Sequence, residues 1–278
     1  CATLCFYCAC NKIVTRNRGH AKPYLERLAR EIELQAGLFP GRPSVDQLHW
    51  GGGTPTFLAD AQIEWLFERI RAAWPLRDDD AGDYAIELDP RAVGAGTIGL
   101  LRRLGFNRAS LGVQDLDPDV QRAVNRIQPE AVTRATLDAC REAGFRSLNI
   151  DLIYGLPLQS LDTFTRTIER VIELAPDRIA LYNYAHLPQY FKPQRRIRAE
   201  DLPSAGERLA ILRRAIERLT GAGYVYIGMD HFARPDDALA RAQRSGTLTR
   251  NFQGYSTHGD CDIVAHGTSA ISMFGDCY

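Results

Sequence analysis

Four cysteines fall within the first ten residues, CATLCFYCAC: Cys1, Cys5, Cys8 and Cys10. Thiolates spaced C-x-x-x-C-x-x-C can wrap around one corner of a cuboidal iron–sulfur cluster, and a set of three leaves one iron open for an outside ligand. The alternative is a structural zinc site, which usually joins two separated ligand pairs. Because the chain has no second C-x-x-C pair, the spacing favours a cluster.

The remaining cysteines do not form an evident disulfide framework. The chain has seven cysteines, an odd number, and the other three are Cys140, Cys261 and Cys277. A 278-residue chain with four of its cysteines packed together is more typical of a reducing compartment and a metal or cluster site.

A glycine-rich segment, GGGTPT at residues 51–56, is the second motif with chemical potential. Backbone without side chains approaches a ligand closely and offers N–H groups to a carboxylate or phosphate. A simple tight turn is the alternative. The segment lacks the spaced glycines of dinucleotide-binding loops.

The elements that must position these motifs alternate between strand and helix. Periodicity predicts helices around 63–70, 98–104, 129–143, 161–174 and 204–221. It predicts strands at 45–50, 84–89, 108–113, 148–155, 178–184 and 224–229. Six such units imply right-handed crossovers and a parallel sheet, either doubly wound or closed toward a barrel. In both folds the functional site lies at the carboxyl ends of the strands.

Composition limits the classes of partner. The formal net charge is +0 and the pI is about 7.1, which gives no support for nucleic-acid binding through bulk charge. No apolar run approaches the roughly 18–20 residues that a membrane span requires. We therefore expect neither nucleic acid nor membrane as a partner.

The two motifs together resemble the radical S-adenosylmethionine (SAM) superfamily, in which the cysteine motif carries an aromatic residue before its third cysteine, here Tyr7. Further segments narrow the resemblance to bacterial oxygen-independent coproporphyrinogen III oxidases. They are CNKIVTR, QLHWGGGTPT, GVQD, VNR, NIDLIYGLP, NYAHLP, GMDHFARPDDALA, RNFQGY and SAISMFGDCY. The resemblance implies an open (β/α)6 partial TIM-like barrel over residues 1–278, an excised core without the family's N-terminal segment and C-terminal domain.

The resemblance also implies a reaction. A [4Fe-4S] cluster would bind SAM at its open iron, and one-electron reduction would cleave SAM to methionine and a 5′-deoxyadenosyl radical. The radical takes hydrogen from a propionate of coproporphyrinogen III, and loss of CO2 and one electron leaves a vinyl group. Two propionates react, giving protoporphyrinogen IX in heme biosynthesis. We expect a cytoplasmic, monomeric oxidoreductase served by a small reducing electron-transfer protein. A heme chaperone of the same superfamily and a zinc-stabilised non-catalytic domain are the alternatives.

Site residues carry over by position in the motifs. Cys1, Cys5 and Cys8 match the cluster ligands, and Tyr7 matches an aromatic residue beside adenine. Matches to contacts with the first SAM are Gly52, Glu87 and Ile271. Matches to positions around a second SAM are Gly53, Thr54, Gln114, Arg126, Asp151 and Ala185.

Other residues have less specific roles. Cys10 is outside the implied ligand set, but it separates the oxidases from the heme chaperones, whose cysteine motif is shorter. Position makes His231, with Asp230, a candidate substrate contact. Arg234 and Arg250 are candidate partners for substrate carboxylates, which require cationic donors. A helix cap is the predicted role of Asp89.

Overall fold

The computed structural model describes residues 1–275 and residue 277. Its strands are β1 (Gln47–Trp50), β2 (Asp83–Leu88), β3 (Arg108–Gln114), β4 (Ser147–Tyr154), β5 (Arg178–Asn183), β6 (Val225–Gly228), β7 (His231–Ala233), β8 (Thr249–Asn251) and β9 (Gly254–Ser256). Its α-helices are α1 (Ala21–Ala36), α2 (Asp60–Ala73), α3 (Ala95–Leu104), α4 (Pro118–Ala123), α5 (Glu130–Ala143), α6 (Leu161–Leu174), α7 (Ala205–Gly221) and α8 (Ala238–Ser245). Short 3-10 helices are η1 (Arg18–His20), η2 (Pro55–Phe57), η3 (Lys192–Arg196) and η4 (Ala199–Asp201).

The first five strands form the predicted parallel sheet. β1 to β5 pair in sequence order, each parallel to the next, and helices connect them. The register places Glu87 opposite Ser110, and Ser110 opposite Asn149. Because side chains alternate between the two faces of a strand, these three polar residues share one face of the sheet. The predicted α/β fold with a parallel, barrel-like sheet is confirmed.

Alternation along each strand separates an apolar face from a polar one. In β2 the buried residues are Tyr84, Ile86 and Leu88, and in β3 they are Ala109, Leu111 and Val113. These side chains pack in one core with residues of α2, α3, α5 and α6. The helices therefore cover the outer face, and the polar residues between them line the inner face.

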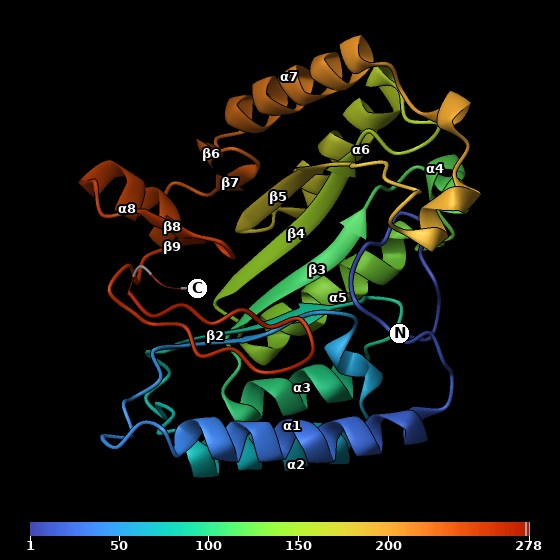
Figure 1. Cartoon of the computed structure of the whole chain (residues 1–278). Helices are drawn as coiled ribbons and strands as arrows, with labels where there is room; N and C mark the ends of the chain where they lie inside the picture. The colour runs from blue at the N-terminus through green and yellow to red at the C-terminus, as the bar shows by residue number, and fades with distance from the viewer. Residues whose placement is uncertain (276, 278) are drawn as a thin grey trace.

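Figure 1 shows how the termini lie relative to this sheet. The arrowheads of β3 and β4 point toward the side on which the blue N-terminal segment lies. The red C-terminal segment returns across the sheet to α1, where Gln35 Nε2 donates to the Ala265 carbonyl at 3.4 Å. The cysteine loop is thus placed at the carboxyl ends of the parallel strands.

The sixth unit differs from its prediction. The strand predicted at 224–229 is present as β6, but it does not pair with β5, because β7, which was not predicted, lies between them and pairs antiparallel with both. Gly228 and Met229 have φ values of 141° and 49°, and this left-handed backbone reverses the chain. β7 therefore takes the place beside β5, and β6 becomes the edge of a seven-stranded sheet. With β1 at the other edge, the barrel is open.

Helices long and apolar enough to cross a membrane do not occur in the part of the chain that the structure describes.

Candidate functional site

The cysteine loop is anchored to the connection between β3 and α5. Phe6 N donates to the Val124 carbonyl at 2.9 Å, and Asn125 Nδ2 donates to the Leu4 carbonyl at 2.7 Å. Asn125 has φ of 55°, a conformation that asparagine tolerates better than most residues. Within the loop, Cys8 N bonds to the Cys5 carbonyl at 3.3 Å, which turns the chain between these two thiols.

The glycine segment lies directly against the first cysteine. Thr54 Oγ1 is 3.2 Å from Cys1 Sγ, and a Cβ atom on Gly53 would lie 3.4 Å from the same sulfur. Gly52 has φ of 105°, which strongly favours glycine. Cys1 and Thr54 are 53 residues apart in sequence, and tertiary structure brings the two motifs into contact.

Glu87 lies near the carboxyl end of β2 beside the glycines. Its Oε1 is 3.4 Å from His49 Nε2, and the Glu87 side chain is 43% exposed. A Cβ atom on Gly51 would lie 2.7 Å from Glu87 Oε1 and 2.6 Å from His49 Nε2, so any larger residue would displace this pair. We call the carboxyl ends of the parallel strands the mouth of the open barrel. Glu87 is a partly exposed carboxylate at this mouth, suited to accept hydrogen bonds from a ligand ammonium.

Cys5 is the most enclosed of the three implied ligands, with 7% of the residue exposed. Arg91 Nη2 approaches its sulfur at 3.5 Å, and Arg126 Nη1 approaches it at 3.7 Å. Asp89 accepts from Arg91 at 2.9 and 2.7 Å and also contacts Arg126 at 3.4 Å. Asp89 is not a helix cap as predicted: α3 begins six residues later, after Gly94. Its carboxylate holds two guanidinium groups at the cluster loop instead.

Arg126 is buried, with 6% of the residue exposed, and it also donates to the Gly112 carbonyl. Its Nε has no hydrogen-bond partner among the described residues. Burial works against the charged form, but the pKa of Arg126 is raised on balance by nearby anionic groups, including Asp89. A permanently charged guanidinium in this position is not a surface arginine and remains available to an anionic ligand.

Asp151 forms a polar group with its neighbours on the inner face of the sheet. Ser110 Oγ and Asn149 Nδ2 each donate to its carboxylate at 2.8 Å. Burial raises the pKa of Asp151 to about 6, and the charge of Glu87 acts in the same direction. Gln114 ends β3 with φ of 71°. These residues lie on the strand face that also carries Glu87.

Gln194 joins two of the sequence-derived residues. Its Nε2 donates to the Tyr7 carbonyl at 2.9 Å and to the Ala185 carbonyl at 3.1 Å. The ring of Tyr7 packs against a small core that includes Val124 and Tyr184. Sequence reasoning missed Gln194, although it lies only nine residues beyond Ala185, in η3 after β5. Only 1% of Gln194 is exposed, and no sequence pattern indicated that this polar residue would be buried.

Cys8 and Cys10 form a thiol pair beside Lys12. The Cys10 thiol lowers the pKa of Cys8 to about 5, chiefly by donating a hydrogen bond to it. Conversely, the pKa of Cys10 is raised by the same interaction. Lys12 Nζ bonds to the carbonyls of Cys8 and Cys10 at 3.0 and 2.9 Å and closes this end of the loop. A readily ionised Cys8 suits a thiolate ligand.

The donor set is compatible with a cluster. Cys1, Cys5 and Cys8 lie in one short loop and are free thiols, and thiolates are the protein ligands of such clusters. Among residues 1–275 and 277, no three His, Cys, Asp or Glu side chains gather closely enough to hold one metal ion. The loop, its glycine neighbour and the two guanidinium groups are compatible with an anionic cluster.

Other expected contacts lie elsewhere. Arg234 is not at the mouth: its backbone N bonds to Asp177, which precedes β5, and its guanidinium covers the Tyr224 ring at 5.5 Å. That position is the amino end of β5, because β7 runs antiparallel to it. Ile271 is 50% exposed in the C-terminal segment. Of the predicted motif SAISMFGDCY, Asp276 and Tyr278 lie outside the described residues.

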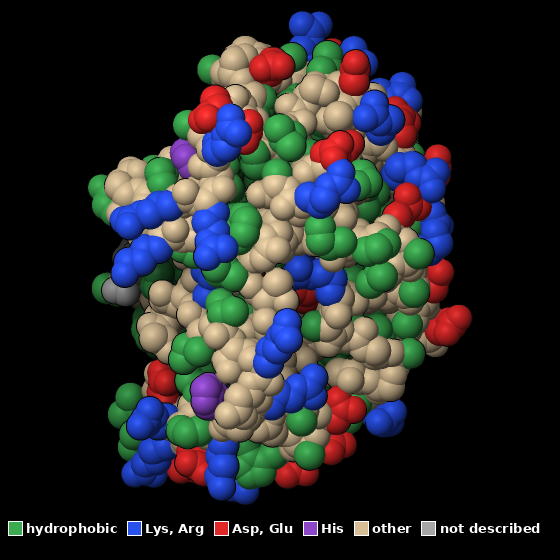
Figure 2. Space-filling model, turned by 90° about the vertical axis from the view of Figure 1, so that its right-hand side faces the viewer, with side chains coloured by type: hydrophobic (Ala, Val, Ile, Leu, Met, Phe, Trp, Pro, Cys, Tyr) green, Lys and Arg blue, Asp and Glu red, His purple; other side chains and the backbone are tan. Residues whose placement is uncertain are grey.

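His231 does face the inner side of the sheet. Its Nδ1 is 2.7 Å from Asp230 Oδ1, and its ring meets those of Tyr182 and Tyr255 at 6.1 and 5.5 Å. Arg250 lies over the Tyr255 ring at 5.8 Å. Figure 2 views the molecule from the side of the N-terminal segment and shows a hollow near the centre of this face, with acidic and basic atoms together in it.

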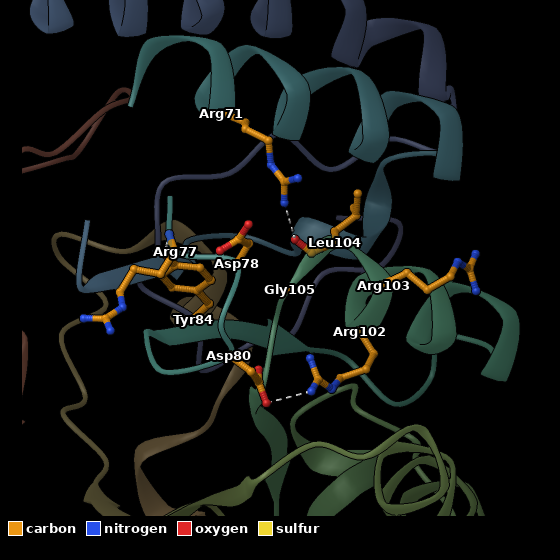
Figure 3. A pocket seen from close by; sticks show the side chains of 9 residues that line it. All are labelled: Arg71, Arg77, Asp78, Asp80, Tyr84, Arg102, Arg103, Leu104 and Gly105. Atoms are coloured by element: carbon orange, nitrogen blue, oxygen red, sulfur yellow. Dashed lines mark hydrogen bonds and ion pairs between the residues drawn. The ribbon is translucent and has the colours of Figure 1, made fainter. Parts of the chain in front are cut away.

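A different hollow, of about 310 Å³, lies at the opposite end of the sheet (Figure 3). Arg102 Nη2 bonds to Asp80 at 2.8 Å, and Arg71 Nη2 caps the Leu104 carbonyl at 3.3 Å. Figure 3 shows Arg77 and Arg103 directed to opposite sides, so the arginines do not converge on one ligand. The catalytic candidate is therefore the mouth and not this hollow.

Comparison with known proteins agrees with the class that this site defines. Residues 1–171 match the Radical SAM superfamily, and the chain belongs to that superfamily. It is 58% identical over its whole length to a Pseudomonas aeruginosa protein named oxygen-independent coproporphyrinogen III oxidase, and 54% identical to the Escherichia coli protein of the same name. The chain spans 60% of the length of each.

A solved structure gives the same result. The chain superposes on the Escherichia coli coproporphyrinogen III oxidase, described as a radical SAM enzyme, with a TM-score of 0.96 and 53% identity. The match covers 99% of this chain and 63% of that one. The chain therefore has the radical SAM fold, and membership of the superfamily supports a [4Fe-4S] cluster and SAM as its cofactors.

Proposed function

We propose that this protein is an oxygen-independent coproporphyrinogen III oxidase that converts two propionates of coproporphyrinogen III to vinyl groups. The observation that carries the proposal is identity of 54–58% across all 278 residues with proteins of that name. The proposal includes residues 1–278 as the catalytic barrel, a cytoplasmic location, a monomeric state and a small reducing electron-transfer protein as partner.

In this proposal Cys1, Cys5 and Cys8 hold the cluster. When bound, the cluster and SAM supply the one-electron chemistry that abstracts hydrogen from the substrate. The chain orients these groups: Thr54 and Gly53 lie against Cys1, and Arg91 and Arg126 enclose the sulfur of Cys5.

Glu87 is the proposed acceptor for the ammonium group of the first SAM. Its side chain is partly exposed at the carboxyl end of β2, and the backbone of Gly51 and Gly52 leaves room beside it. Tyr7 and Ile271 are the proposed apolar contacts. Ile271 stands in the C-terminal segment, half exposed, so this contact depends on the segment closing over the ligand.

A second SAM is the finer part of the proposal. Arg126 has an unpaired buried Nε suited to a carboxylate, and Asp151 offers a carboxylate from the inner face. Gly53, Thr54, Gln114 and Ala185 complete the proposed site. Substrate carboxylates require cationic partners, and Arg250 is the proposed one, with His231 as a further substrate contact. Both side chains lie against the Tyr255 ring, and His231 belongs to β7, which lies beyond β5 from β2 in the sheet.

The test is anaerobic turnover by the reconstituted protein with SAM, dithionite and coproporphyrinogen III. We expect protoporphyrinogen IX, with release of CO2, and methionine and 5′-deoxyadenosine from SAM. Heme binding without protoporphyrinogen formation would favour the chaperone. One zinc per chain without sulfide would favour the non-catalytic domain.

A further inference from the structure

Arg91 is a charged residue at the cysteine loop to which the motif comparison gives no role. It follows β2 in the connection to α3, two residues after Asp89. Its Nη2 stands 3.5 Å from Cys5 Sγ. The contact joins residues 86 positions apart in sequence, and the Arg91 side chain is only 19% exposed.

Asp89 fixes the orientation of this guanidinium. Arg91 Nε and Nη2 bond to the two carboxylate oxygens at 2.9 and 2.7 Å, and the Arg91 backbone N bonds to Oδ1 at 3.0 Å. A two-point fork of this kind sets the plane of the guanidinium. The remaining Nη2 hydrogen is thereby directed toward the sulfur.

The charges around the three implied ligands are unequal. Cys1 Sγ contacts the Thr54 hydroxyl, and Cys8 receives the Cys10 thiol and has one cation beside it, Lys12, whose Nζ also bonds to the Cys8 carbonyl. Cys5 instead faces the guanidinium groups of Arg91 and Arg126, with the single negative charge of Asp89 between them. The balance at Cys5 is therefore one net positive charge, in surroundings largely closed to water.

We propose that Arg91 is a positioning residue that raises the reduction potential of the cluster through Cys5. Hydrogen bonds and positive charge at ligand sulfurs are among the factors that set the potential of such clusters. One electron enters from a low-potential electron-transfer protein, no bond forms or breaks, and the added negative charge spreads onto the thiolates. A fixed cation at Cys5 stabilises that reduced state more than the oxidised one. The inference rests on Cys5 being a cluster ligand, as the proposed function states.

The experiment is an anaerobic potentiometric titration of the reconstituted protein with dithionite and mediators, followed by absorption and electron paramagnetic resonance. Arg91→Gln removes the charge and keeps a polar side chain. We expect the ratio of reduced to oxidised cluster at the wild-type midpoint to fall about tenfold, equivalent to about 59 mV for one electron. Arg91→Lys retains the charge without the fork and should give a smaller shift in the same direction.

Arg77→Gln is the matched control. Arg77 also forks an aspartate two residues away, Asp79, at 3.2 and 2.8 Å, but at the other end of the sheet. Its removal should leave the potential unchanged.

A wild-type potential in Arg91→Gln, with iron and sulfide content intact, would overturn the proposal. Loss of the cluster in both Arg91 variants would also overturn it, because Arg91 would then be needed to build the site and not to set its potential. The titration needs no porphyrin substrate, so failure of the oxidase assay would not affect it. A cluster retained by Cys5→Ala would instead contradict the ligand assignment.

Discussion

The two ends of the parallel sheet carry similar residue types and use them differently. At the amino end, Arg102 bonds to Asp80 and to the Gly144 carbonyl, while Asn107 bonds to Asp80 and Gly82. These polar groups pair within the protein and fasten helix ends to strand starts. At the carboxyl end, the thiols of the cysteine loop are free, and the buried Nε of Arg126 has no hydrogen-bond partner among the described residues.

Two arginine–aspartate ion pairs, one at each end of the sheet, show this difference most directly. Arg77–Asp79 and Arg91–Asp89 are both forked ion pairs between residues two apart. The first is on the surface, where such pairs contribute little to stability. The second is enclosed and presents one guanidinium nitrogen to a cysteine sulfur. Location in the fold, and not residue type, separates a structural charge from one available to a ligand.

The largest expected effect belongs to Cys5→Ala at the carboxyl end. It removes a thiolate ligand, so we expect complete loss of the visible absorption of the cluster and of SAM cleavage. Absorption, iron and sulfide content after anaerobic reconstitution measure this. Cys10→Ala is the matched change, and it should keep the cluster. Cluster loss in Cys10→Ala would make Cys10 a ligand.

Glu87→Gln should come next. It removes the carboxylate that we assign to the ammonium of the first SAM while keeping the side-chain shape. A hydrogen bond to a charged group contributes about 1.5–3 kcal/mol, so the SAM dissociation constant should rise about 10- to 100-fold. Equilibrium dialysis measures the change. Glu64→Gln, on the exposed surface of α2, should bind SAM as the wild type does; equal affinity for Glu87→Gln would contradict the assignment.

Asp151 gives the site a pH dependence. Its pKa of about 6 lies above the ordinary 3.8 because burial disfavours the carboxylate, so the folded protein holds this proton more tightly than the unfolded chain. The Asp151 contribution to stability therefore falls as pH rises from about 4 to about 6. The proposed role of Asp151 is to accept a hydrogen bond from the second SAM, which requires the ionised carboxylate. The affinity for that SAM should therefore fall about tenfold per pH unit below about 6. Asp151→Asn should abolish this dependence; a SAM stoichiometry unaffected by pH would count against the role.

Asp80→Asn at the amino end should have the smallest effect, and on stability alone. It weakens the ion pair with Arg102 but keeps an acceptor for Asn107. Because the Asp80 side chain is 38% exposed, we expect a loss of about 1 kcal/mol in the free energy of unfolding. Urea denaturation measures this. Weakened SAM binding in Asp80→Asn would contradict the division between the two ends.

Prediction from sequence succeeded where the signal was local or periodic. The five parallel strands and the helix at 161–174 follow from alternating and 3.6-residue patterns. It failed for β7, whose three residues are too few to show a period. It also offered Arg234 as a partner for substrate carboxylates, but β7 runs antiparallel to β5 and leads Arg234 to the amino end of that strand.

The candidate site divides in the same way. Cys1, Cys5 and Cys8 lie within one short loop, so their spacing alone could predict a shared cluster. Contacts of Arg91 and Gln194 with this loop join segments 86 and 187 residues apart. No local pattern encodes such contacts, because they depend on strand register and on the paths of the intervening loops.

The sequence by itself determined the ligand types, their spacing and the alternation that puts Glu87, Ser110 and Asp151 on the inner face of the sheet. Tertiary structure alone decided which charges meet the cysteine loop and which are neutralised at the other end. The physical reason is the distance along the sequence over which each effect acts. Thiol spacing and strand periodicity act over a few residues, whereas burial and charge pairing arise only when distant segments pack together.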